Sequence, residues 1–520
     1  MSEGAAPATR PAARLGKLGG ETPWAWVLLS LVGAGTGLFA SLVLYGTKTV
    51  WLALLVAGVL ALIPTFALRD PRPYWLGLFL FIIQFEIKKN LNDGLSIVRA
   101  YDIDYTLYNF TFEVRGSDLV FLVLAFLWLH DVIFRKQKLR LPRATWLAVA
   151  YLALCLLSLV GARWPYLGIV ELVRQSRFLV FFLYAYNNLC STKWLRLIAA
   201  AAIAILALQG AVTAGRYVFE FYDPIAFGES HQDEGERDRY LQIERGPGVS
   251  GIATRRAFGT GTSPGSTGKL CLMVIPFALL CCLRNPLLRG QLVITLILAA
   301  SLGALVLTFA RSFYAAAGVE LAAGFLIALW RGYLPRSGAL LIVALGLAAA
   351  AFAFPKVYET FSYRWSAVDV RFAQYSSSIA QIKAHPLRGV GFNNGTGLKR
   401  EYVVASFDPT DPASQSHSEP THNLYLALAA DIGIPGALCF VAFFAVVVRA
   451  AWRLARASRD PSAAFFANAV LVVFAGVATV TMGDPFHEDA VLALTWMYSG
   501  IILGFYDAEF GPRSRSSTLA

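Results

Sequence analysis

Charged residues are scarce in this sequence of 520 residues. They make up 15% of the chain, whereas 57% of it is hydrophobic, and a soluble protein of this length is about a quarter charged. This composition excludes an ordinary water-soluble globular protein. The formal net charge of +12 comes mostly from Lys and Arg in short loops, as in membrane proteins, so we expect no nucleic-acid partner.

Cysteines and familiar catalytic motifs are also sparse. The six cysteines lie in or at the edge of apolar segments, which predicts neither a disulfide framework nor a cysteine metal site. The sequence has no His-Glu-x-x-His, phosphate-binding P-loop or Gly-x-Ser-x-Gly motif. The pair Asp102 and Asp104 has no identifiable partner ligands, and we expect neither a metal ion nor a cofactor.

Long apolar runs fill most of the chain instead. Many have the length of about 17–25 residues that crosses the hydrocarbon core of a bilayer, and they predict an all-α polytopic membrane protein with about 14 transmembrane helices. A basic first segment without a cleavage site predicts that the first run is a retained helix and not a cleaved signal peptide. The expected helices are 24–45, 49–67, 74–87, 117–134, 144–161, 167–188, 195–215, 269–284, 290–309, 313–330, 337–354, 423–448, 463–482 and 489–506.

Basic residues alternate along the links between these helices. With the N-terminus inside, every link on the cytoplasmic side is basic and the short exterior links are much less so, which predicts that both termini are cytoplasmic. The three long loops, including a modest one at 88–116, then lie outside. The expected parts are an N-terminal cytoplasmic segment (1–23), an N-terminal transmembrane bundle (24–215), an exterior loop (216–268), transmembrane helices (269–354), a large exterior catalytic loop (355–422), C-terminal transmembrane helices (423–506) and a cytoplasmic tail (507–520).

The largest polar interruption runs from Pro355 to about Gly436. Within it, apolar residues recur every three or four positions from Arg364 to Lys383, which predicts an amphipathic helix. His385-Pro386 ends this helix, because the residue before proline is disfavoured in the helical region. Residues 407–418 are rich in Pro, Asp and Ser and are expected to form a flap. An enzyme outside the cytoplasm has no ATP or nucleotide sugar, so a lipid-linked donor is the natural candidate.

His422 stands where this loop meets the next apolar run. Its neutral imidazole can accept a proton near pH 7, as a general base must. Thr421 and Asn423 flank it and could fix its tautomer or bind a sugar hydroxyl. The alternative is an interfacial histidine without a catalytic role. The rival histidine is His487, whose acidic exterior turn could bind a cation or, as we favour, be a solvated loop.

Arginines in or beside the apolar runs are the second candidates. Arginine inside a membrane span is costly and commonly faces a cavity or an anionic partner. We favour a cavity for Arg177 and Arg311, whereas for Arg174 snorkelling to the surface is an equal alternative. The planar guanidinium recognises phosphate with two hydrogen bonds. The arginines that could converge on a pyrophosphate are Arg177, Arg311, Arg364, Arg371 and the pair Arg255 and Arg256.

Three stretches resemble one known family. His422-Asn423, followed by nine residues and Gly433-Ile434-Pro435-Gly436, resembles the His-Asn-x9-Gly-x-x-Gly signature of the O-antigen ligase and O-antigen polymerase superfamily. Ala310-Arg311-Ser312 is similar to its Ser-Arg-x element, with alanine in place of serine. The stretch 385–392 is similar to its Pro-Leu-x-Gly-Val-Gly sequence. The matches follow the family's order and cover roughly residues 300–440.

The resemblance implies a GT-C-like glycosyltransferase of the bacterial inner membrane. Such enzymes take a glycan from undecaprenyl pyrophosphate on the periplasmic face and pass it to an acceptor hydroxyl, with inversion and without a metal. It implies that His422 is the base and that Arg311 and Arg371 are the essential arginines, with Arg364 as the alternative to Arg371. The segment Gly259–Lys269 is similar to a family region that ends in Asn but lacks that Asn, so the contact it would make is in doubt.

The resemblance leaves more than one activity open. We favour a polymerase of surface polysaccharide repeat units, because two large exterior loops and about 14 spans suit an enzyme that must hold two lipid-linked glycans. The alternative is a ligase that transfers the finished glycan to lipid A–core, and a transporter is a remote one. The expected partners are the lipid-linked donor, a glycan or lipid A–core acceptor, bilayer lipids and other polysaccharide assembly proteins.

Overall fold

The computed structural model describes residues 64, 67–85, 87–90, 113–219, 256–261, 263–283, 290–308, 310–334, 366–402, 420–486 and 488–511. Residues 1–74 and 75–520 form two compact units. Few residues of the first unit are described, and the architecture given below is that of the second.

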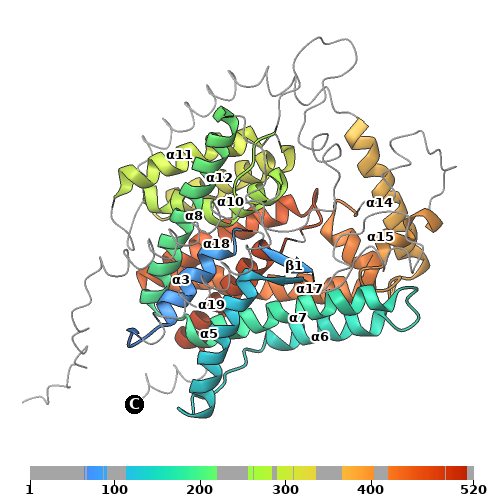
Figure 1. The fold of residues 1–520 in the computed structure, drawn as a ribbon, viewed down its shortest axis with the longest axis horizontal. Helices are drawn as coiled ribbons and strands as arrows, with labels where there is room; N and C mark the ends of the chain where they lie inside the picture. The colour runs from blue at the N-terminus through green and yellow to red at the C-terminus, as the bar shows by residue number, and fades with distance from the viewer. Residues whose placement is uncertain are drawn as a thin grey trace, which may run out of the picture. The chain divides into compact units, whose positions relative to one another are not determined.

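The described residues are helical apart from one short pair of strands (Figure 1). Strand β1 (Lys88–Asn90) pairs antiparallel with β2 (Glu113–Arg115). A 3-10 turn, Lys399–Tyr402, follows α15. The helices are α3 (Arg72–Ile82), α5 (Gly116–Ile133), α6 (Thr145–Ser158), α7 (Pro165–Asn188), α8 (Thr192–Phe219), α10 (Pro264–Leu283), α11 (Gln291–Leu307), α12 (Arg311–Trp330), α14 (Ser366–Ala384), α15 (Gly395–Leu398), α17 (Leu424–Ala457), α18 (Pro461–Val480) and α19 (Asp489–Phe510).

The helices have the length and composition of membrane spans. In the described part of the chain, seven helices are long and apolar enough to cross a bilayer, namely α5, α8, α10, α12, α17, α18 and α19, while α6 and α11 are shorter apolar helices. The prediction of an all-α polytopic membrane protein is therefore confirmed. The expected helices 24–45 and 337–354, and nearly all of 49–67, lie outside the described residues, so the count of about 14 stays a prediction.

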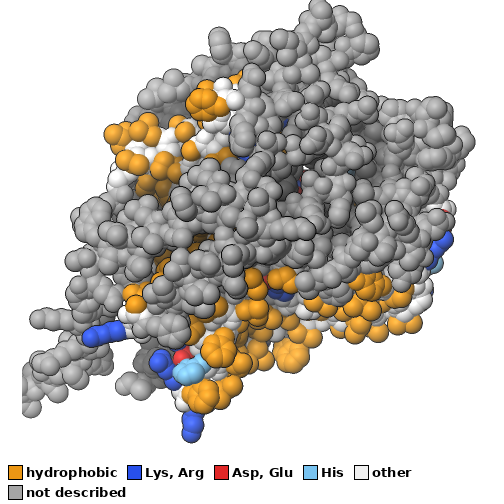
Figure 2. All heavy atoms as spheres, viewed as in Figure 1, with side chains coloured by type: hydrophobic (Ala, Val, Ile, Leu, Met, Phe, Trp, Pro, Cys, Tyr) orange, Lys and Arg blue, Asp and Glu red, His pale blue; other side chains and the backbone are white. Residues whose placement is uncertain are grey.

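Large apolar side chains also cover outward-facing surfaces of these helices. Figure 2 shows them along the lower face of the view. Trp146, Leu156 and Leu157 on α6 and Leu122 and Phe126 on α5 are each more than half exposed. Such surfaces are rare on soluble monomers, and they suit contact with lipid tails.

Several helix boundaries differ from the expected ones by three or more residues, and two of them show why. The run expected at 74–87 ends as a helix at Ile82, and the run expected at 423–448 continues as α17 to Ala457. Hydropathy ends this second run where Arg449 begins a basic stretch, but arginine and alanine are strong helix formers. The helix therefore continues beyond its apolar part.

The predicted helix of the large loop is present as α14. It ends at Ala384, directly before His385-Pro386, as predicted. Residues 364 and 365 of the predicted helix lie outside the described residues. Figure 1 shows α14 and α15 together at one end of α17, and α6 and α7 running side by side along it.

A break in α17 holds the segment that follows α14. Gly433 has φ 74°, a left-handed conformation that glycine adopts readily. The break frees backbone groups for the incoming chain: Val390 N donates to Ala430 O (2.9 Å), and Ile434 N donates to Pro386 O (2.8 Å). A Cβ on Gly433 would collide with the backbone of Leu387. Glycine is thus required where the loop crosses α17.

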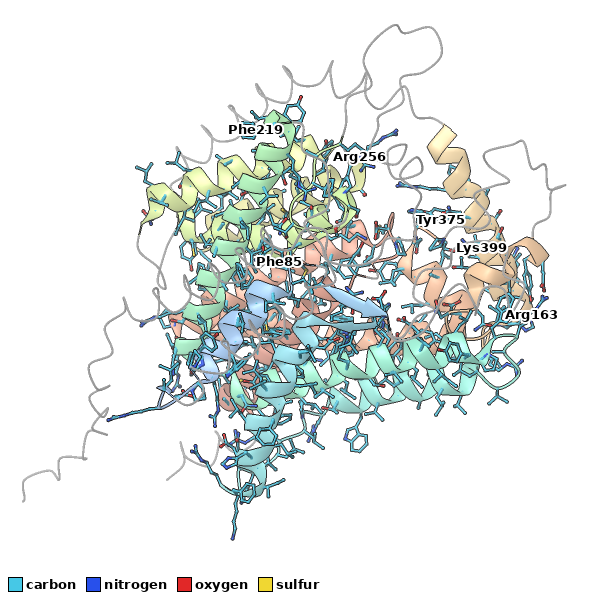
Figure 3. The ribbon with its side chains drawn as sticks, viewed as in Figure 1. Phe85, Arg163, Phe219, Arg256, Tyr375 and Lys399 are labelled. Carbon is cyan, nitrogen blue, oxygen red and sulfur yellow. The ribbon has the colours of Figure 1, made fainter. Side chains whose placement is uncertain are left out.

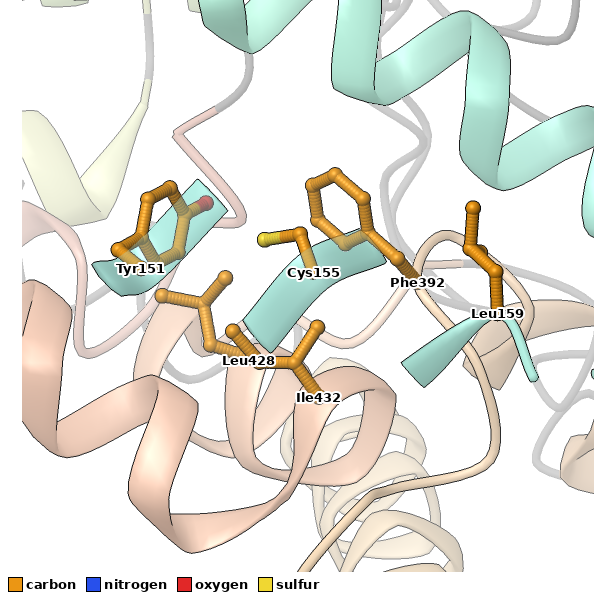
Figure 4. Packing of buried hydrophobic residues seen from close by; sticks show 6 residues of the cluster. All are labelled: Tyr151, Cys155, Leu159, Phe392, Leu428 and Ile432. Carbon is orange, nitrogen blue, oxygen red and sulfur yellow. The ribbon is translucent and has the colours of Figure 1, made fainter. Parts of the chain in front are cut away.

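A hydrophobic cluster holds the loop after α14 in place where it contacts α17. Figure 4 shows Phe392 of the loop packed among Tyr151 and Cys155 of α6 and Leu428 and Ile432 of α17. All five are buried. Burying a side chain of this size stabilises the fold by about 1.5–3 kcal/mol, so the cluster fixes α14 and its following loop to α6 and α17.

Candidate functional site

The start of α17 positions His422. Asn423 is the N-cap residue, and its Oδ1 accepts a hydrogen bond from Leu426 N (3.0 Å). An asparagine cap stabilises a helix by about 1 kcal/mol relative to alanine. Its Nδ2 donates to Met482 O (3.3 Å). The fold thus uses both ends of the Asn423 amide, and contact of this residue with a sugar stays a prediction.

One buried glutamine orients the His422 ring. Gln374 of α14 is fully buried, and its Oε1 lies 2.9 Å from His422 Nδ1 and accepts from His422 N at 3.3 Å. A backbone N–H can only donate, so the Gln374 atom is the accepting amide oxygen. The ring must then carry its hydrogen on Nδ1. This tautomer leaves the lone pair of Nε2 for an incoming proton.

Tyr375 joins three parts of the chain at the same place. Its hydroxyl lies 2.9 Å from His422 O and 3.1 Å from Met482 O. The residue belongs to α14, the two carbonyls belong to the start of α17 and to the turn after α18, and Figure 3 shows its position. The turn after α18 is thereby brought to the histidine.

The surroundings keep His422 neutral. The pKa of His422 is lowered to about 4, chiefly by burial and also by the nearby cations Arg371, Lys399 and Lys269, while Asp484 acts in the opposite direction. At neutral pH the imidazole is therefore unprotonated, as a general base must be.

Arg371 lies beside the same turn. A Cβ built on Gly483 would lie 3.6 Å from Arg371 Nη1 and 3.8 Å from Ser312 Cβ. The guanidinium of α14, the first turn of α12 and the turn after α18 therefore meet. Among the described residues, no carboxylate forms an ion pair with Arg371.

Arg311 and Arg256 approach this region from two further segments. Arg311 is the first residue of α12, where the unsatisfied N–H groups and the helix dipole favour an anion. Arg256 Nε donates to Thr308 O (2.9 Å), and Ala257 N donates to Leu307 O (3.1 Å), so the segment before α10 lies along the end of α11. The structure thus brings Arg256 to the same helix junction as Arg311.

Arg177 lies in a different environment. Its guanidinium forms ion pairs with Asp118 and Asp489. Asp489 also pairs with Arg174 (2.9 Å) and Arg115 (2.8 Å). We call these five residues the Asp489 cluster. Charges inside a membrane protein are retained when they are paired, so Arg174 does not snorkel, and a role for Arg177 in binding pyrophosphate stays a prediction.

The acidic turn after α18 was expected to be a solvated loop, with a bound cation as the alternative. Its carboxylates instead pair with a buried lysine. Lys269, which is 2% exposed, pairs with Asp484 (2.6 Å) and with Glu488. The turn is thus neutralised by a lysine from inside α10. His487 itself lies outside the described residues. The preference for a solvated loop was wrong, because the buried ammonium was not visible from the neighbours of the turn in sequence.

Several site residues escaped the sequence reasoning. Gln374 has no signal in a single sequence beyond its place on the buried side of the amphipathic helix. Lys269 gave one signal, a charge at the edge of an apolar run. Arg216, at the end of α8, is 2% exposed, and its guanidinium stacks 4.0 Å over the ring of Phe258.

The remaining predicted features lie elsewhere. Arg364, Arg255 and the expected flap 407–418 are outside the described residues. Within the described ranges, no group of three or more His, Cys, Asp or Glu side chains could hold a metal ion. The arrangement as described offers a neutral imidazole with an available Nε2 near Arg371, and it places Arg311 and Arg256 together at the junction of α11 and α12.

The chain was compared with known proteins. A family model described as O-antigen ligase matches residues 296–441, which span α11, α12, α14 and the first half of α17. The match contains Arg311, Arg371 and His422. No curated protein matches the chain.

Proposed function

We propose, on the premise that residues 296–441 form a domain of the O-antigen ligase and O-antigen polymerase superfamily, that the protein is an inverting glycosyltransferase. Its donor would be a glycan linked to undecaprenyl pyrophosphate. The observation that supports this best is the tautomer of His422. Gln374 holds Nδ1–H, so Nε2 is the atom that can take a proton from an acceptor hydroxyl.

In the proposed transfer, every bond that forms and every proton that moves is accounted for by the acceptor, the donor, His422 and solvent. The acceptor hydroxyl gives its proton to His422 Nε2 while its oxygen attacks the anomeric carbon of the donor sugar. The bond between that carbon and the pyrophosphate oxygen breaks, and undecaprenyl pyrophosphate leaves with the electron pair. Attack from the face opposite the leaving group inverts the anomeric centre. The imidazolium then releases its proton to solvent.

The arginines would stabilise the negative charge of the leaving group. Arg371 and Arg311 are assigned to the pyrophosphate, because one lies beside the Gly483 turn and the other begins α12. Arg256 is the next candidate. Arg364 is kept as the alternative to Arg371. Arg177 already has two carboxylate partners, so we assign it only a supporting role. Preorganised donors of this kind contribute several kcal/mol to transition-state stabilisation, with about 2.7–4 kcal/mol for a single donor.

The donor would also tune the base. A pKa of about 4 makes the free imidazole a weak base, because a catalytic base works best with a pKa near the working pH. A pyrophosphate beside Arg371 and Lys399 would offset their positive charge and raise the pKa of His422. The histidine would then become an effective base only when the donor is bound.

Polymerisation of repeat units remains the favoured activity, with transfer to lipid A–core as the alternative. The proposed location is the bacterial inner membrane, with both termini in the cytoplasm and the site facing the periplasm. Other polysaccharide assembly proteins are proposed partners. No metal ion or cofactor is invoked.

Reconstitution tests the proposal. The purified protein would be supplied with undecaprenyl-pyrophosphate-linked repeat units and no other acceptor, and products would be separated on a gel. A ladder of longer lipid-linked chains identifies a polymerase, and products formed only when lipid A–core is added identify a ligase. Folded protein that transfers glycan under neither condition would contradict the proposal and return the transporter to consideration.

A further inference from the structure

A cavity of about 120 Å³ lies next to the start of α17. One water needs about 10–15 Å³ by this measure, so the cavity has room for a ligand much larger than water. Its walls come from α6, α7, α17, the loop after α14 and the turn before α19. The residues of the O-antigen ligase domain and residues outside it thus contribute to one space.

The lining of the cavity has two kinds of side chain. The rings of Tyr151, Phe392 and Phe440 provide apolar faces, and the carboxylates of Glu171 and Asp431 provide hydrogen-bond acceptors. Pockets that bind small polar molecules combine apolar walls with a few placed polar groups. A sugar ring has this duality, because its C–H faces pack on aromatic rings and its hydroxyls donate to carboxylates.

The two carboxylates are held rigidly and keep acceptor capacity. Asp431 Oδ1 accepts from Gly395 N (2.7 Å) and Oδ2 accepts from Asn393 N (3.2 Å). Glu171 accepts three hydrogen bonds, from Arg174 Nε and Nη2 (2.8 Å each) and from Gln175 Nε2 (2.7 Å). A carboxylate has about four acceptor positions, so each retains at least one for a hydroxyl.

Strained backbone is concentrated at the cavity. Among the described residues only Lys136, Asn393 and Phe486 combine a side chain with positive φ. Asn393 (φ 58°) and Phe486 (φ 52°) both line this cavity. For a bulky residue such a conformation costs about 1–3 kcal/mol and clusters at ligand sites. The fold maintains this strain where it shapes the cavity walls.

The cavity adjoins the catalytic histidine but not the arginines assigned to the donor. Thr421 and Leu424, which bracket His422 and Asn423 in the chain, belong to its wall, so the wall reaches both sides of the histidine, although His422 itself is not part of it. No residue next to Arg371 or Arg311 in the chain belongs to the wall. Its charged lining is two carboxylates and one guanidinium, Arg174, that is already paired with Glu171. Such a surface repels a pyrophosphate and accepts uncharged hydroxyl groups.

We propose that this cavity binds a sugar ring of the acceptor glycan and directs its hydroxyl toward His422 Nε2. That the sugar belongs to an acceptor follows only if the proposed glycosyl transfer is correct. The binding of a sugar ring in this cavity can be tested without transfer. Asp431 and Glu171 would receive hydrogen bonds from the ring hydroxyls, and Tyr151 and Phe392 would cover its apolar face.

The test uses a pair of alanines on α17. Ala427 lines the cavity and Ala429 does not, and both are half-buried on the same helix. Ala427→Leu should fill the cavity without removing a polar group, whereas Ala429→Leu is the matched control. The probe is the free oligosaccharide released by mild acid from the lipid-linked repeat units, and its binding to the purified protein is measured by saturation-transfer-difference NMR.

We expect wild-type protein, Ala429→Leu and His422→Ala to bind the probe with similar affinity, and Ala427→Leu to bind it at least tenfold more weakly. With the probe as acceptor and saturating lipid-linked donor, Ala427→Leu should raise the acceptor KM at least tenfold and leave kcat at saturation unchanged. Equal affinity of Ala427→Leu and Ala429→Leu, or no binding by the wild type, would overturn the proposal.

Two further outcomes separate this inference from the proposed function. If the wild type transfers no glycan but binds the probe in a manner sensitive to Ala427→Leu, the sugar site stands and the proposed function fails. If Ala427→Leu does not fold, Gln175→Met decides, since it removes a polar wall group with little change in volume. Unchanged probe affinity in that variant would contradict the sugar site.

Discussion

Two groups of described arginines differ in their partners. In the Asp489 cluster, Arg174 and Arg177 each pair with two carboxylates. Beside the Gly483 turn, Arg371 has a serine and a glycine as neighbours and no carboxylate partner among the described residues. The same side chain is therefore neutralised by the fold in one region and available to an anion in the other.

The comparison shows that an arginine inside a membrane protein can either stabilise the fold through ion pairs or remain available to bind an anionic substrate. A buried guanidinium surrounded by carboxylates links helices, here α5, α7 and α19, and its net contribution depends on complete pairing. A guanidinium that lies near His422 without a carboxylate partner, as Arg371 does among the described residues, leaves a positive charge that a pyrophosphate could neutralise. Substitutions in the Asp489 cluster should therefore lower stability, whereas substitutions of Arg371 should lower activity and leave stability unchanged.

The largest expected effect is that of His422→Ala. Removing a general base costs about 10²–10⁴-fold in rate, so glycan transfer should fall by that factor while the protein accumulates and melts normally. Transfer is measured as initial rate with reconstituted protein. His130→Ala is the matched control, because His130 is exposed on α5, and it should leave the rate unchanged. A fully active His422→Ala variant would remove this residue from the mechanism.

The Asp489 cluster should control stability. Asp489→Asn leaves three guanidinium groups around a neutral amide, and breaking a buried ion pair by removing one partner costs about 3–5 kcal/mol. We expect a clear fall in Tm of the detergent-solubilised protein. The control is Glu401→Gln, because Glu401 pairs with Arg163 where both side chains are more than half exposed and an exposed ion pair contributes only about 0–1 kcal/mol, so this variant should change Tm little. Should Asp489→Asn melt like the wild type, the cluster would not be structural, and Arg177 would become a stronger candidate for the substrate.

Arg371→Lys should affect activity and leave stability unchanged. Lysine keeps the charge but cannot form two parallel hydrogen bonds to phosphate, and a hydrogen bond to a charged group contributes about 1.5–3 kcal/mol. We expect kcat/KM for the lipid-linked donor to fall by about 10–100-fold, since 1.36 kcal/mol corresponds to tenfold. Arg388→Lys, exposed in the loop after α14, is the control. An equal loss in both variants would argue against a specific contact by Arg371.

The smallest expected effect is a shift in the pH profile. Only neutral His422 can accept a proton, so kcat/KM should be constant near neutral pH and fall as pH decreases through about 4, the pKa of the free protein. Arg371 lowers that pKa, so Arg371→Gln should raise it and move the acid limb to higher pH. Arg177→Gln should not move it. A shift in the opposite direction would show that another group titrates.

The sequence predicted much of the fold and part of the site. Apolar run length predicted the helices, and the period of three and four predicted α14 with its end at His385-Pro386. The position of His422 at the start of a helix followed from the same run. The ends of helices were predicted less well, because hydropathy reports where a helix leaves the apolar region and not where its hydrogen bonding stops, as the continuation of α17 through Arg449 shows.

Partners distant in sequence could not be predicted. Nothing near Lys269 indicates that it pairs with Asp484, and nothing near Gln374 indicates that it fixes the tautomer of His422. Each contact joins different helices, and the choice among many polar side chains is made when those helices pack. The break at Gly433 could be predicted only in part. Glycine and proline indicated a turn, but only the structure showed that the loop after α14 forms hydrogen bonds there.

By itself the sequence determined which segments are helices long and apolar enough to span a membrane, and which histidine and arginines stand at their ends, because both depend on the local order of side chains. The tertiary structure decided which arginines are neutralised and which atom of His422 holds the hydrogen. It also decided that a cavity forms next to the start of α17. These properties depend on burial and on distances between segments far apart in the chain, and no local pattern encodes them.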